Sequence, residues 1–419
     1  MSEHWPEISL SQLATVTMGQ SPEASCVSSD ERGLPFLQGC AEFGARVPSP
    51  KLHCSPPLRV AKAGSVLISV RAPVGTTNFA DQDYCIGRGL GAVTAKPESA
   101  DNIFLFHAIG QNVGFLHRRS QGSTFLAIGS KDLSTLPVPA LGLSTQRRIA
   151  EILSTVDEAI EQTEALIAKY QQIKEGLMHD LFTRGVTPDG HLRPTRGQAP
   201  LLYKESPLGW IPKEWDIVSV RGCGSVQLGR QRSPDQMSGR WTMPYLRVAN
   251  VFDGYIDYSD VLEMDFTPDE RRTFSLKQGD ILLNEGQSLE LVGRCALYDG
   301  QDDAFCFQNT LVRFRPFDKQ CPFFYRFLFK WFLDCGLFMR IAKQTTSVAH
   351  LGAGRFARMR CISVPYDEQL RIAERLGILQ ARLDSDMAHA SKLCQQKQGL
   401  MQDLLTGRVR VTVGESASA

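Results

Sequence analysis

One stretch of the sequence occurs twice, and this repeat limits the possible folds of the chain more than any other feature. Residues 146–186 align with residues 369–409 without a gap, at an offset of 223, and 17 of the 41 aligned positions are identical. A shared composition would not reproduce the order Gln-x-Arg-Ile-Ala-Glu near one end and Gly-Leu-Met-x-Asp-Leu near the other. Both stretches are therefore predicted to be copies of one structural element rather than two unrelated surface helices.

The repeat carries the heptad pattern of a coiled-coil helix. In both copies apolar side chains recur at alternating steps of four and three residues, which keeps one seam of a helix facing a partner. Lys174 and Lys397 interrupt the seam at equivalent positions, where a charged side chain lowers stability and helps to fix the register. The predicted seam consists of Ile149, Leu153, Val156, Ile160, Ile167, Tyr170, Leu177, Leu181, Ile372, Leu376, Leu379, Leu383, Leu393, Leu400 and Leu404.

The length of these helices indicates that they pack against each other. A helix of roughly 38 residues is ~57 Å long, which exceeds the width of a small domain. Each predicted helix begins where a globular domain ends. We therefore expect an antiparallel pair with a pseudo-twofold axis between two domains.

The remaining residues predict two similar globular domains. Trp5 and Gly19 match Trp215 and Gly229 at an offset of 210. A buried strand is expected at 66–70, and the fold class is mixed α/β (α+β). A helix is expected at 103–117, and the aromatic stripe at 324–338 is interpreted as core packing rather than a base-stacking platform. The predicted order is a first domain at 1–143, a long helix at 144–186, a polar linker at 187–208, a second domain at 209–365, a second long helix at 366–409 and a disordered tail at 410–419.

Composition bounds the location and the partners of the chain. The start MSEHWPEISL lacks the features of a signal peptide, and no uncharged apolar run reaches membrane-spanning length, so we expect a cytoplasmic protein. The eleven cysteines form no CxxC pair and no zinc spacing, and they are interpreted as reduced thiols. The net charge is only +1, so a nucleic-acid-binding face would have to be a local patch.

No familiar catalytic or metal-binding motif is found. The sequence lacks an NPPY-like tetrapeptide, a GxxxxGK[ST] phosphate loop and an HExxH helix. The glycine-rich segment 87–91 lacks the spacing of a dinucleotide site and is interpreted as a tight turn. We therefore expect no catalytic residues and no metal site.

The order of these features resembles the specificity subunit of type I restriction-modification enzymes over nearly the whole chain. The matching motifs are Gln146-Arg147-Arg148-Ile149-Ala150-Glu151, Gly176-Leu177-Met178-x-Asp180-Leu181, Ser206-Pro207-Leu208-Gly209-Trp210-Ile211-Pro212 and Leu289-Glu290-Leu291-Val292-Gly293-Arg294. The resemblance implies two target-recognition domains, central and distal conserved helices, and a DNA-binding subunit without chemistry of its own. It also implies two methyltransferase subunits as partners, with restriction-translocase subunits as further ones. S-adenosylmethionine, ATP and magnesium would belong to those partners, so none is expected on this chain.

The candidate DNA contacts are polar side chains in or beside predicted turns. Bases are read by Arg, Lys, Asn, Gln and short hydroxyl side chains, whereas phosphates are contacted by cations and backbone amides. The candidates are Arg71, Arg88, Arg118, Arg119, Gln121, Ser123 and Thr124 in the first domain, and Arg230, Arg232, Arg247, Asn250, Asn284, Gln287, Gln308, Asn309, Gln344, Thr345 and Thr346 in the second. Because the two sets differ, the expected DNA site is bipartite and asymmetric.

Two other classes of function remain open at this point. The chain could be a coiled-coil scaffold that carries two domains for ligands other than DNA, or an enzyme with an unfamiliar active site. Activity of the isolated chain on DNA would favour the enzyme. Absence of salt-dependent duplex binding in the presence of a methyltransferase would favour the scaffold.

Overall fold

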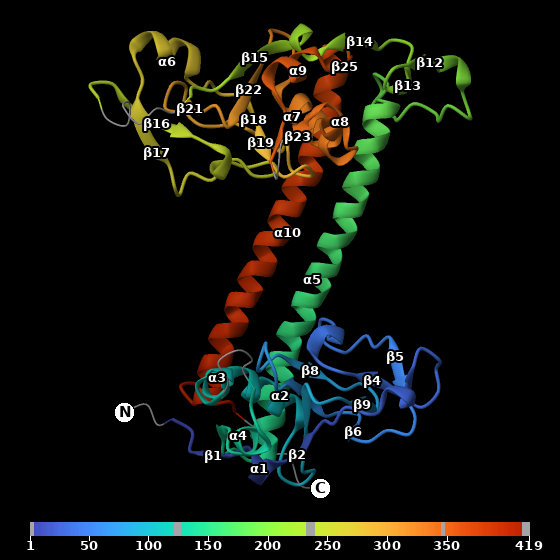
Figure 1. Cartoon of the computed structure of the whole chain (residues 1–419), viewed down its shortest axis with the longest axis vertical. Coiled ribbons are helices and arrows are strands. Elements are labelled where there is room, and N and C mark those ends of the chain that lie inside the picture. The colour runs from blue at the N-terminus through green and yellow to red at the C-terminus, as the bar shows by residue number, and fades with distance from the viewer. Residues whose placement is uncertain (1–3, 121–126, 232–238, 345–347, 413–419) are drawn as a thin grey trace. The chain divides into compact units, whose positions relative to one another are not determined.

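The computed structural model describes residues 4–120, 127–231, 239–344 and 348–412. It divides into two units, each containing one globular domain and segments of two long helices (Figure 1). The first unit comprises Met1–Ala165 with Met387–Ala419, and the second comprises Leu166–Asp386. The mixed α/β class and the order of domain, long helix, domain and long helix agree with the expectation from the sequence.

The long helices are α5 (Leu143–Thr183) and α10 (Tyr366–Thr406), each of 41 residues. Helix α5 ends three residues before the predicted position, and Gly185 follows with a φ of +65°. Gly407 follows α10 with a φ of +85°. Glycine adopts this left-handed conformation without a Cβ clash, so it commonly terminates helices.

The helix segments within each unit run antiparallel, as predicted. In the first unit, Ile149 near the start of α5 shares a hydrophobic core with Leu404 near the end of α10. In the second unit, Leu181 near the end of α5 shares a core with Ile372 near the start of α10. The seam residues at the helix ends therefore also complete the cores of the two domains.

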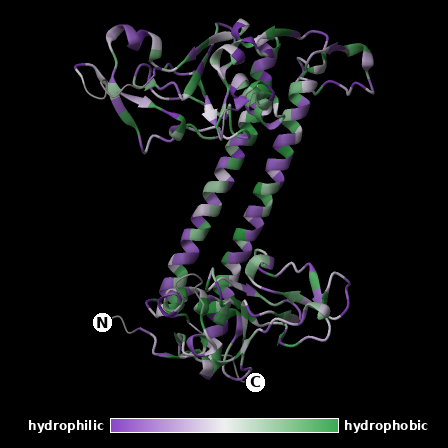
Figure 2. Cartoon of the chain, in the orientation of Figure 1, coloured by the Kyte–Doolittle hydropathy of each residue, from purple (hydrophilic) through white to green (hydrophobic). Residues whose placement is uncertain are grey.

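Burial along the seam is uneven. Seven seam residues are buried, and all except Leu383 lie near the helix ends, at Ile149, Leu153, Leu181, Ile372, Leu376 and Leu404. The remaining eight are partly buried, and they are Val156, Ile160, Ile167, Tyr170, Leu177, Leu379, Leu393 and Leu400. Figure 2 shows that polar and apolar residues alternate along both helices. The hydrophobic contribution per residue is therefore larger where the helices enter the domains.

The first domain is built on two sheets. An antiparallel four-stranded sheet has the order β2-β10-β7-β8, and a second sheet has the order β3-β5-β4-β9-β6, in which β4 and β9 are parallel. The strands of the first sheet are β2 (Ala14–Met18), β10 (Leu90–Ala95), β7 (Val66–Ser69) and β8 (Thr77–Phe79). Those of the second are β3 (Val27–Ser28), β5 (Leu52–Cys54), β4 (Leu34–Leu37), β9 (Tyr84–Ile86) and β6 (Val60–Ala61). The remaining elements are β1 (Glu7–Ser9), which pairs with β11 (Pro137–Pro139), and the helices α1 (Leu10–Leu13), α2 (Asn102–Gln111), α3 (Val113–Arg119) and α4 (Ser130–Ser134).

The second domain repeats this arrangement. Its antiparallel sheet has the order β15-β22-β18-β20, and a smaller sheet has the order β17-β16-β21, in which β16 and β21 are parallel. These strands are β15 (Gly224–Leu228), β22 (Leu311–Pro316), β18 (Ile281–Asn284), β20 (Cys295–Leu297), β17 (Leu262–Asp265), β16 (Thr242–Leu246) and β21 (Cys306–Phe307). The other strands are the pair β14 (Asp216–Ser219) and β25 (Arg360–Ser363), and the sheet β19 (Gly286–Gln287), β24 (Ala349–His350) and β23 (Lys343–Gln344). The helices are α6 (Pro268–Phe274), α7 (Pro322–Asp334), α8 (Leu337–Ile341) and α9 (Ala353–Arg358).

The single helix expected at 103–117 is wrong in one respect, because the chain forms α2 and α3 with a break at Asn112. The Asn112 side chain donates to the carbonyl oxygens of Ala108 (3.3 Å) and Pro137 (3.2 Å). Asparagine side chains that bond to nearby backbone compete with the helical pattern. The contact with Pro137 comes from a distant segment, so helical periodicity could not reveal it.

The aromatic stripe packs in the core of the second domain, as predicted. Phe324, Phe327, Phe332 and Phe338 are buried. The stripe is split between α7 and α8, and Gly336 lies between them with a φ of +68°. These side chains are therefore not available as a platform for bases.

The segment predicted as a linker, 187–208, is ordered and contributes to the second unit. Strand β12 (Tyr203–Ser206) lies within it and pairs with β13 (Gly209–Pro212). The guanidinium of Arg196 lies 3.8 Å from the centre of the Trp210 ring. The polar composition of this segment gave no indication that its last residues form one strand of a hairpin.

Candidate nucleic-acid interface

Each domain brings three chain segments together where the central strands of its four-stranded sheet end. This end of the sheet is called the edge of the domain below. In the first domain, Val70 follows β7, donates its N–H to the carbonyl of Gly89 (2.9 Å) and accepts from the N–H of Ile128 (3.0 Å). In the second domain, Glu285 follows β18, donates to Thr310 (2.9 Å) and accepts from Leu351 (2.8 Å). These matching backbone bonds identify two equivalent edges.

The turns at these edges are equivalent in backbone and different in side chain. Gly87 N–H donates to Leu37 (2.8 Å), and Gln308 N–H donates to Leu246 (2.9 Å). Gly87-Arg88-Gly89 in the first domain therefore corresponds to Gln308-Asn309-Thr310 in the second. A guanidinium occupies the position that a carboxamide occupies in the other copy.

The glycines of the first turn are required by close packing, which supports its interpretation as a tight turn. A Cβ on Gly89 would lie 2.7 Å from the carbonyl oxygen of Gln38, and one on Gly87 would lie 2.6 Å from its side-chain oxygen. Arg88, between the two glycines, is exposed. The turn thus presents one cationic side chain to solvent.

The described candidates of the first domain lie around this edge. Arg71 is exposed and forms a backbone bridge with Ala127. Arg118 and Arg119 are exposed at the end of α3, where Arg119 donates to Thr135 Oγ1 (3.0 Å). Within the described residues, no ion pair involves Arg88 or any of these three arginines. Their charges are available to an anionic ligand, whereas Gln121, Ser123 and Thr124 lie outside the described residues.

The second domain presents mainly carboxamides. Gln308 and Asn309 are partly exposed on the equivalent turn, and Gln287 lies in β19. Gln344 is exposed in β23, which shares a three-stranded sheet with β19. Arg232, Thr345 and Thr346 lie outside the described residues. Asparagine and glutamine can read base edges with paired donor and acceptor groups.

Three candidates are buried and hold the fold of the second domain. Asn250 is 2% exposed, and its amide nitrogen donates to the carbonyls of Asp257 (3.0 Å) and Asp260 (2.9 Å). Asn284 is fully buried, and Arg230 forms an ion pair with Glu270 at 2.6 Å. These three side chains are directed into the domain rather than toward a ligand, because carbonyl and carboxylate groups of the domain accept hydrogen bonds from them.

Arg247 is partly buried and also has an internal partner. Its guanidinium lies 2.5 Å from Asp260. This ion pair, next to the two bonds from Asn250 to the same loop, indicates that Arg247 helps to hold the loop. It is therefore a weaker candidate than the exposed arginines of the first domain.

Sequence reasoning missed three polar residues at the edges. Gln38 follows β4, is exposed, and donates to Ser21 Oγ (3.1 Å) beside the Arg88 turn. Lys343 is exposed in β23, and His350 in β24 lies 2.9 Å from Glu285. Gln38 could have been found because it directly follows the buried Phe36-Leu37 pair. The partners of Lys343 and His350 depend on a sheet whose short strands carry no periodic signal.

The chemistry available at these edges is recognition by hydrogen bonds and charge. Among the described residues, no group of three or more His, Cys, Asp or Glu is placed to hold a metal ion. In the same part of the chain, no helix combines the length and apolar character needed to cross a bilayer. The edges offer guanidinium, amide and hydroxyl groups, which are the groups that bind phosphates and base edges.

Comparison with known proteins places the sequence beside one family. The family described as "Type I restriction modification DNA specificity domain" matches residues 50–172. A putative MjaX specificity subunit from Methanocaldococcus jannaschii is 37% identical over 183 residues, covering 43% of this chain and 43% of the relative. The MjaVIII specificity subunit from the same organism is 24% identical over 333 residues, covering 75% and 72%. The match to the MjaX relative thus spans less than half of that protein's length.

Solved structures share the fold along nearly the whole chain. The S subunit of a type I restriction-modification system from M. genitalium has a TM-score of 0.60 at 16% identity, covering 97% of both chains. A chain from a study of the assembly and conformational transition of the type I system has a TM-score of 0.57 at 16% identity, covering 97% and 98%. At this identity the likeness establishes the fold.

Proposed function

We propose that the chain, which is similar in sequence and fold to the specificity subunits of type I restriction-modification systems, belongs to that family and reads the DNA sequence for a type I complex. One observation supports this assignment most directly. The same backbone edge occurs in both domains, with exposed arginines in one and carboxamides in the other. A shared scaffold with different exposed side chains is suited to bind two different words of sequence in a similar way.

The proposed DNA site is bipartite and asymmetric. Arg88 and Asn309 occupy equivalent turns, so each would act on a different word. An arginine prefers the acceptor pair of guanine, whereas an asparagine prefers the donor and acceptor of adenine. The two words would be separated by bases that neither edge contacts.

Chemistry is assigned to partner subunits rather than to this chain. Methyltransferase subunits would supply S-adenosylmethionine-dependent methylation, and restriction subunits would use ATP and magnesium. Exposed apolar residues on the long helices are candidates for the partner contact. In the second unit, Ile173 of α5 is 44% exposed and Ile378 of α10 is 67% exposed. Large exposed apolar side chains of this kind often mark binding surfaces.

A selection experiment tests the DNA-reading proposal. The full chain, co-expressed with a type I methyltransferase subunit, is incubated with random duplexes, and the bound sequences are read. Wild type should enrich two words with a fixed gap. Arg88→Ala should relax one word and Asn309→Ala the other, each by about 1–3 kcal/mol of discrimination at the affected position.

Arg148→Ala is the matched control, because Arg148 is an exposed arginine of α5 paired with Glu151. It should leave both words unchanged. Enrichment of no sequence by the wild-type complex would contradict the DNA-reading proposal. Relaxation of both words by either single variant would contradict the assignment of one word to each edge.

Partner docking is tested by co-purification. Ile173→Asp and Ile378→Asp should lower the yield of methyltransferase bound to the chain, because a buried interface would have to take up an unpaired charge. Leu201→Asp is the control, since Leu201 is 81% exposed in the same unit but outside the long helices. Wild-type yield with both helix variants would reject this surface.

A further inference from the structure

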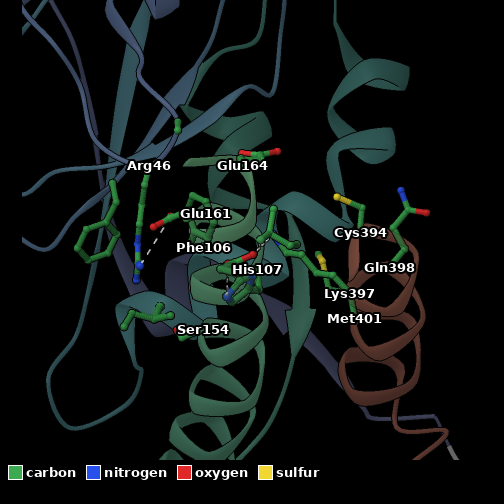
Figure 3. Close-up of a pocket in the computed structure, with 15 residues that line it drawn as sticks. Arg46, Phe106, His107, Ser154, Glu161, Glu164, Cys394, Lys397, Gln398 and Met401 are labelled. Atoms are coloured by element: carbon green, nitrogen blue, oxygen red, sulfur yellow. Dashed lines mark ion pairs between the residues drawn. The ribbon is translucent and has the colours of Figure 1, made fainter. Parts of the chain in front are cut away.

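The two lysines that interrupt the helix seam have different partners, although they occupy equivalent positions of the repeat. In the first unit, Lys397 Nζ lies 2.6 Å from Asp157 Oδ1, and Asp157 Oδ2 lies 3.7 Å from His107 Nε2 (Figure 3). In the second unit, Lys174 Nζ donates to Gln380 Oε1 at 2.5 Å. Gln380 is the repeat equivalent of Asp157, at the same offset of 223. The second lysine therefore faces a neutral acceptor where the first faces a carboxylate.

A small polar cavity lies beside Lys174. Its volume is about 130 Å³, and its lining comes from α5, α10, α7, β20 and the loop at 253–254. This is room for roughly four water molecules. Three cations line it, namely Lys174, Arg326 and Lys330, together with one carboxylate, that of Asp253. A cavity of this size with several converging donors suits a small, highly polar ligand.

The charges around the cavity are only partly balanced. Lys330 Nζ lies 3.3 Å from Asp253 and is also bound to Asp334. Neither Lys174 nor Arg326 forms an ion pair within the described residues. Arg326 instead donates to the carbonyl of Gly254 (3.3 Å). Two cations thus face the cavity with neutral partners only.

The surroundings of these two cations favour an incoming anion. Burial, together with the positive charges of Arg326 and Lys330, lowers the pKa of Lys174, and the carboxylates of Asp253 and Asp334 oppose this shift only in part. A bound anion would relieve this repulsion. Gly254 has a φ of +83°, and a Cβ there would lie 2.2 Å from Arg326 Nη2. Glycine at this position therefore allows the guanidinium to reach the cavity.

We infer that the cavity formed by Lys174, Arg326, Lys330 and Gln380 is a binding site for a phosphate group. A tetrahedral oxyanion offers acceptors in several directions. Lysine supplies a compact charge with three donors, and arginine supplies a planar fork that matches phosphate oxygens. The phosphate could come from free phosphate or from the DNA backbone, and the site itself does not depend on the proposed DNA-reading function.

The decisive variant is Gln380→Glu in the full chain. It is nearly isosteric and would place a carboxylate opposite Lys174, as Asp157 stands opposite Lys397. The variant removes no packing. It loses the bond from Gln380 Nε2 to Asp384 Oδ1 (2.8 Å), but this bond is exposed, so loss of folding is not the expected result. Lys174→Met removes the cation itself. Lys397→Met is the matched control, because it removes the equivalent lysine of the first unit.

Binding is measured by isothermal titration of inorganic phosphate, against sodium chloride at the same ionic strength. Wild type and Lys397→Met should bind one phosphate, and Gln380→Glu and Lys174→Met should bind it at least about tenfold more weakly, since charge-assisted bonds are lost. Absence of phosphate binding by wild type overturns the proposal. So does wild-type affinity in a folded Gln380→Glu variant, as judged by circular dichroism.

A second arm identifies the source of the phosphate. If a DNA phosphate occupies the site, saturating non-specific duplex should abolish phosphate binding, and Gln380→Glu should reduce the salt dependence of duplex binding by about one counterion. If free phosphate is the ligand, it should still bind to the DNA complex. Both results support the site. A chain that binds phosphate but selects no DNA sequence would contradict only the DNA-reading proposal.

Discussion

The junctions where the long helices enter the two domains share one glutamine and differ around it. Gln146 accepts from the N–H of Asp101 (3.0 Å) and donates to the carbonyls of Ser99 (3.0 Å) and Leu141 (2.8 Å). Its counterpart accepts from the N–H of Cys321 (2.9 Å) and donates to Val364 (2.8 Å) and the side chain of Gln320 (2.9 Å). The counterpart is Gln369, and both glutamines are buried.

The two junctions differ at the residue that precedes the glutamine. In the second unit, Glu368 is buried, bonds to Arg193 Nη1 (2.5 Å), and accepts from the N–H of Val186 (2.8 Å) and from Trp215 Nε1 (3.1 Å). The first unit has Thr145 at this position. The glutamine therefore meets a requirement common to both copies, which is pairing of buried backbone groups. The glutamate occurs only in the second copy, where it ties the start of α10 to the segment that follows α5 and to Trp215.

Glu368→Ala should have the largest effect on stability. It leaves Trp215 Nε1 and the Val186 N–H without their acceptor, and it leaves the buried Arg193 charge with only Glu214, 3.6 Å away, as an ion-pair partner. Removing one partner of a buried ion pair typically costs about 3–5 kcal/mol. Chemical denaturation of the full chain measures the loss, and Thr145→Ala is the control, with an expected change within about 0.5 kcal/mol. Equal losses in the two variants would mean that Glu368 is not the centre of this junction.

Gln146→Leu and Gln369→Leu should destabilise by similar amounts, about 2–4 kcal/mol each, because each leaves several buried polar groups unpaired. The test is the free energy of unfolding of each single variant. A large difference between them would break the equivalence of the two junctions. Gln172→Leu, on an exposed position of α5, controls for the change of residue type.

His107→Phe tests a pH effect confined to the first unit. Phe327 is the equivalent residue, since both lie six positions after the residue whose N–H binds the junction glutamine. Burial lowers the pKa of His107 to about 4. The charges of Lys397 and Arg46 act in the same direction, and those of Asp157 and Asp101 oppose it. Between about pH 6.5 and 4 the unfolded chain binds a proton that the folded chain does not, so wild-type stability falls as pH falls through this window.

The variant should reduce that fall by about 1–3 kcal/mol. The measurement compares free energies of unfolding at pH 7 and pH 4.5 for wild type and His107→Phe. Carboxylates elsewhere titrate in both proteins and cancel in the difference. Parallel pH profiles would show that His107 does not remain neutral in the folded chain.

The smallest expected effect separates the two proposed reading edges. Arg88→Ala should lower the salt slope of DNA binding by about one counterion, whereas Asn309→Ala should leave the slope unchanged because a carboxamide displaces no counterion. Duplex affinity at several salt concentrations measures both slopes. Equal slopes in the two variants would remove the electrostatic distinction between the edges.

Repeated local patterns in the sequence were enough to predict the two long helices of this protein and its two similar domains. The heptads at 146–186 and 369–409 indicate two long helices, because helix periodicity is a property of neighbouring residues. The buried strand at 66–70 and the tight turn at 87–91 follow from short-range signals of the same kind. The repeat also indicated that one arrangement is built twice.

Tertiary structure decided which polar residues serve the fold and which face solvent. Asn250 and Asn284 resemble turn residues in sequence, yet both are buried, and their side-chain nitrogens donate to the carbonyls of Asp257 and Val251. The phosphate-sized cavity depends on Arg326 and Lys330 reaching Lys174 from another element. Burial and charge balance arise from contacts between segments far apart in the chain, and single-sequence patterns carry no record of those contacts.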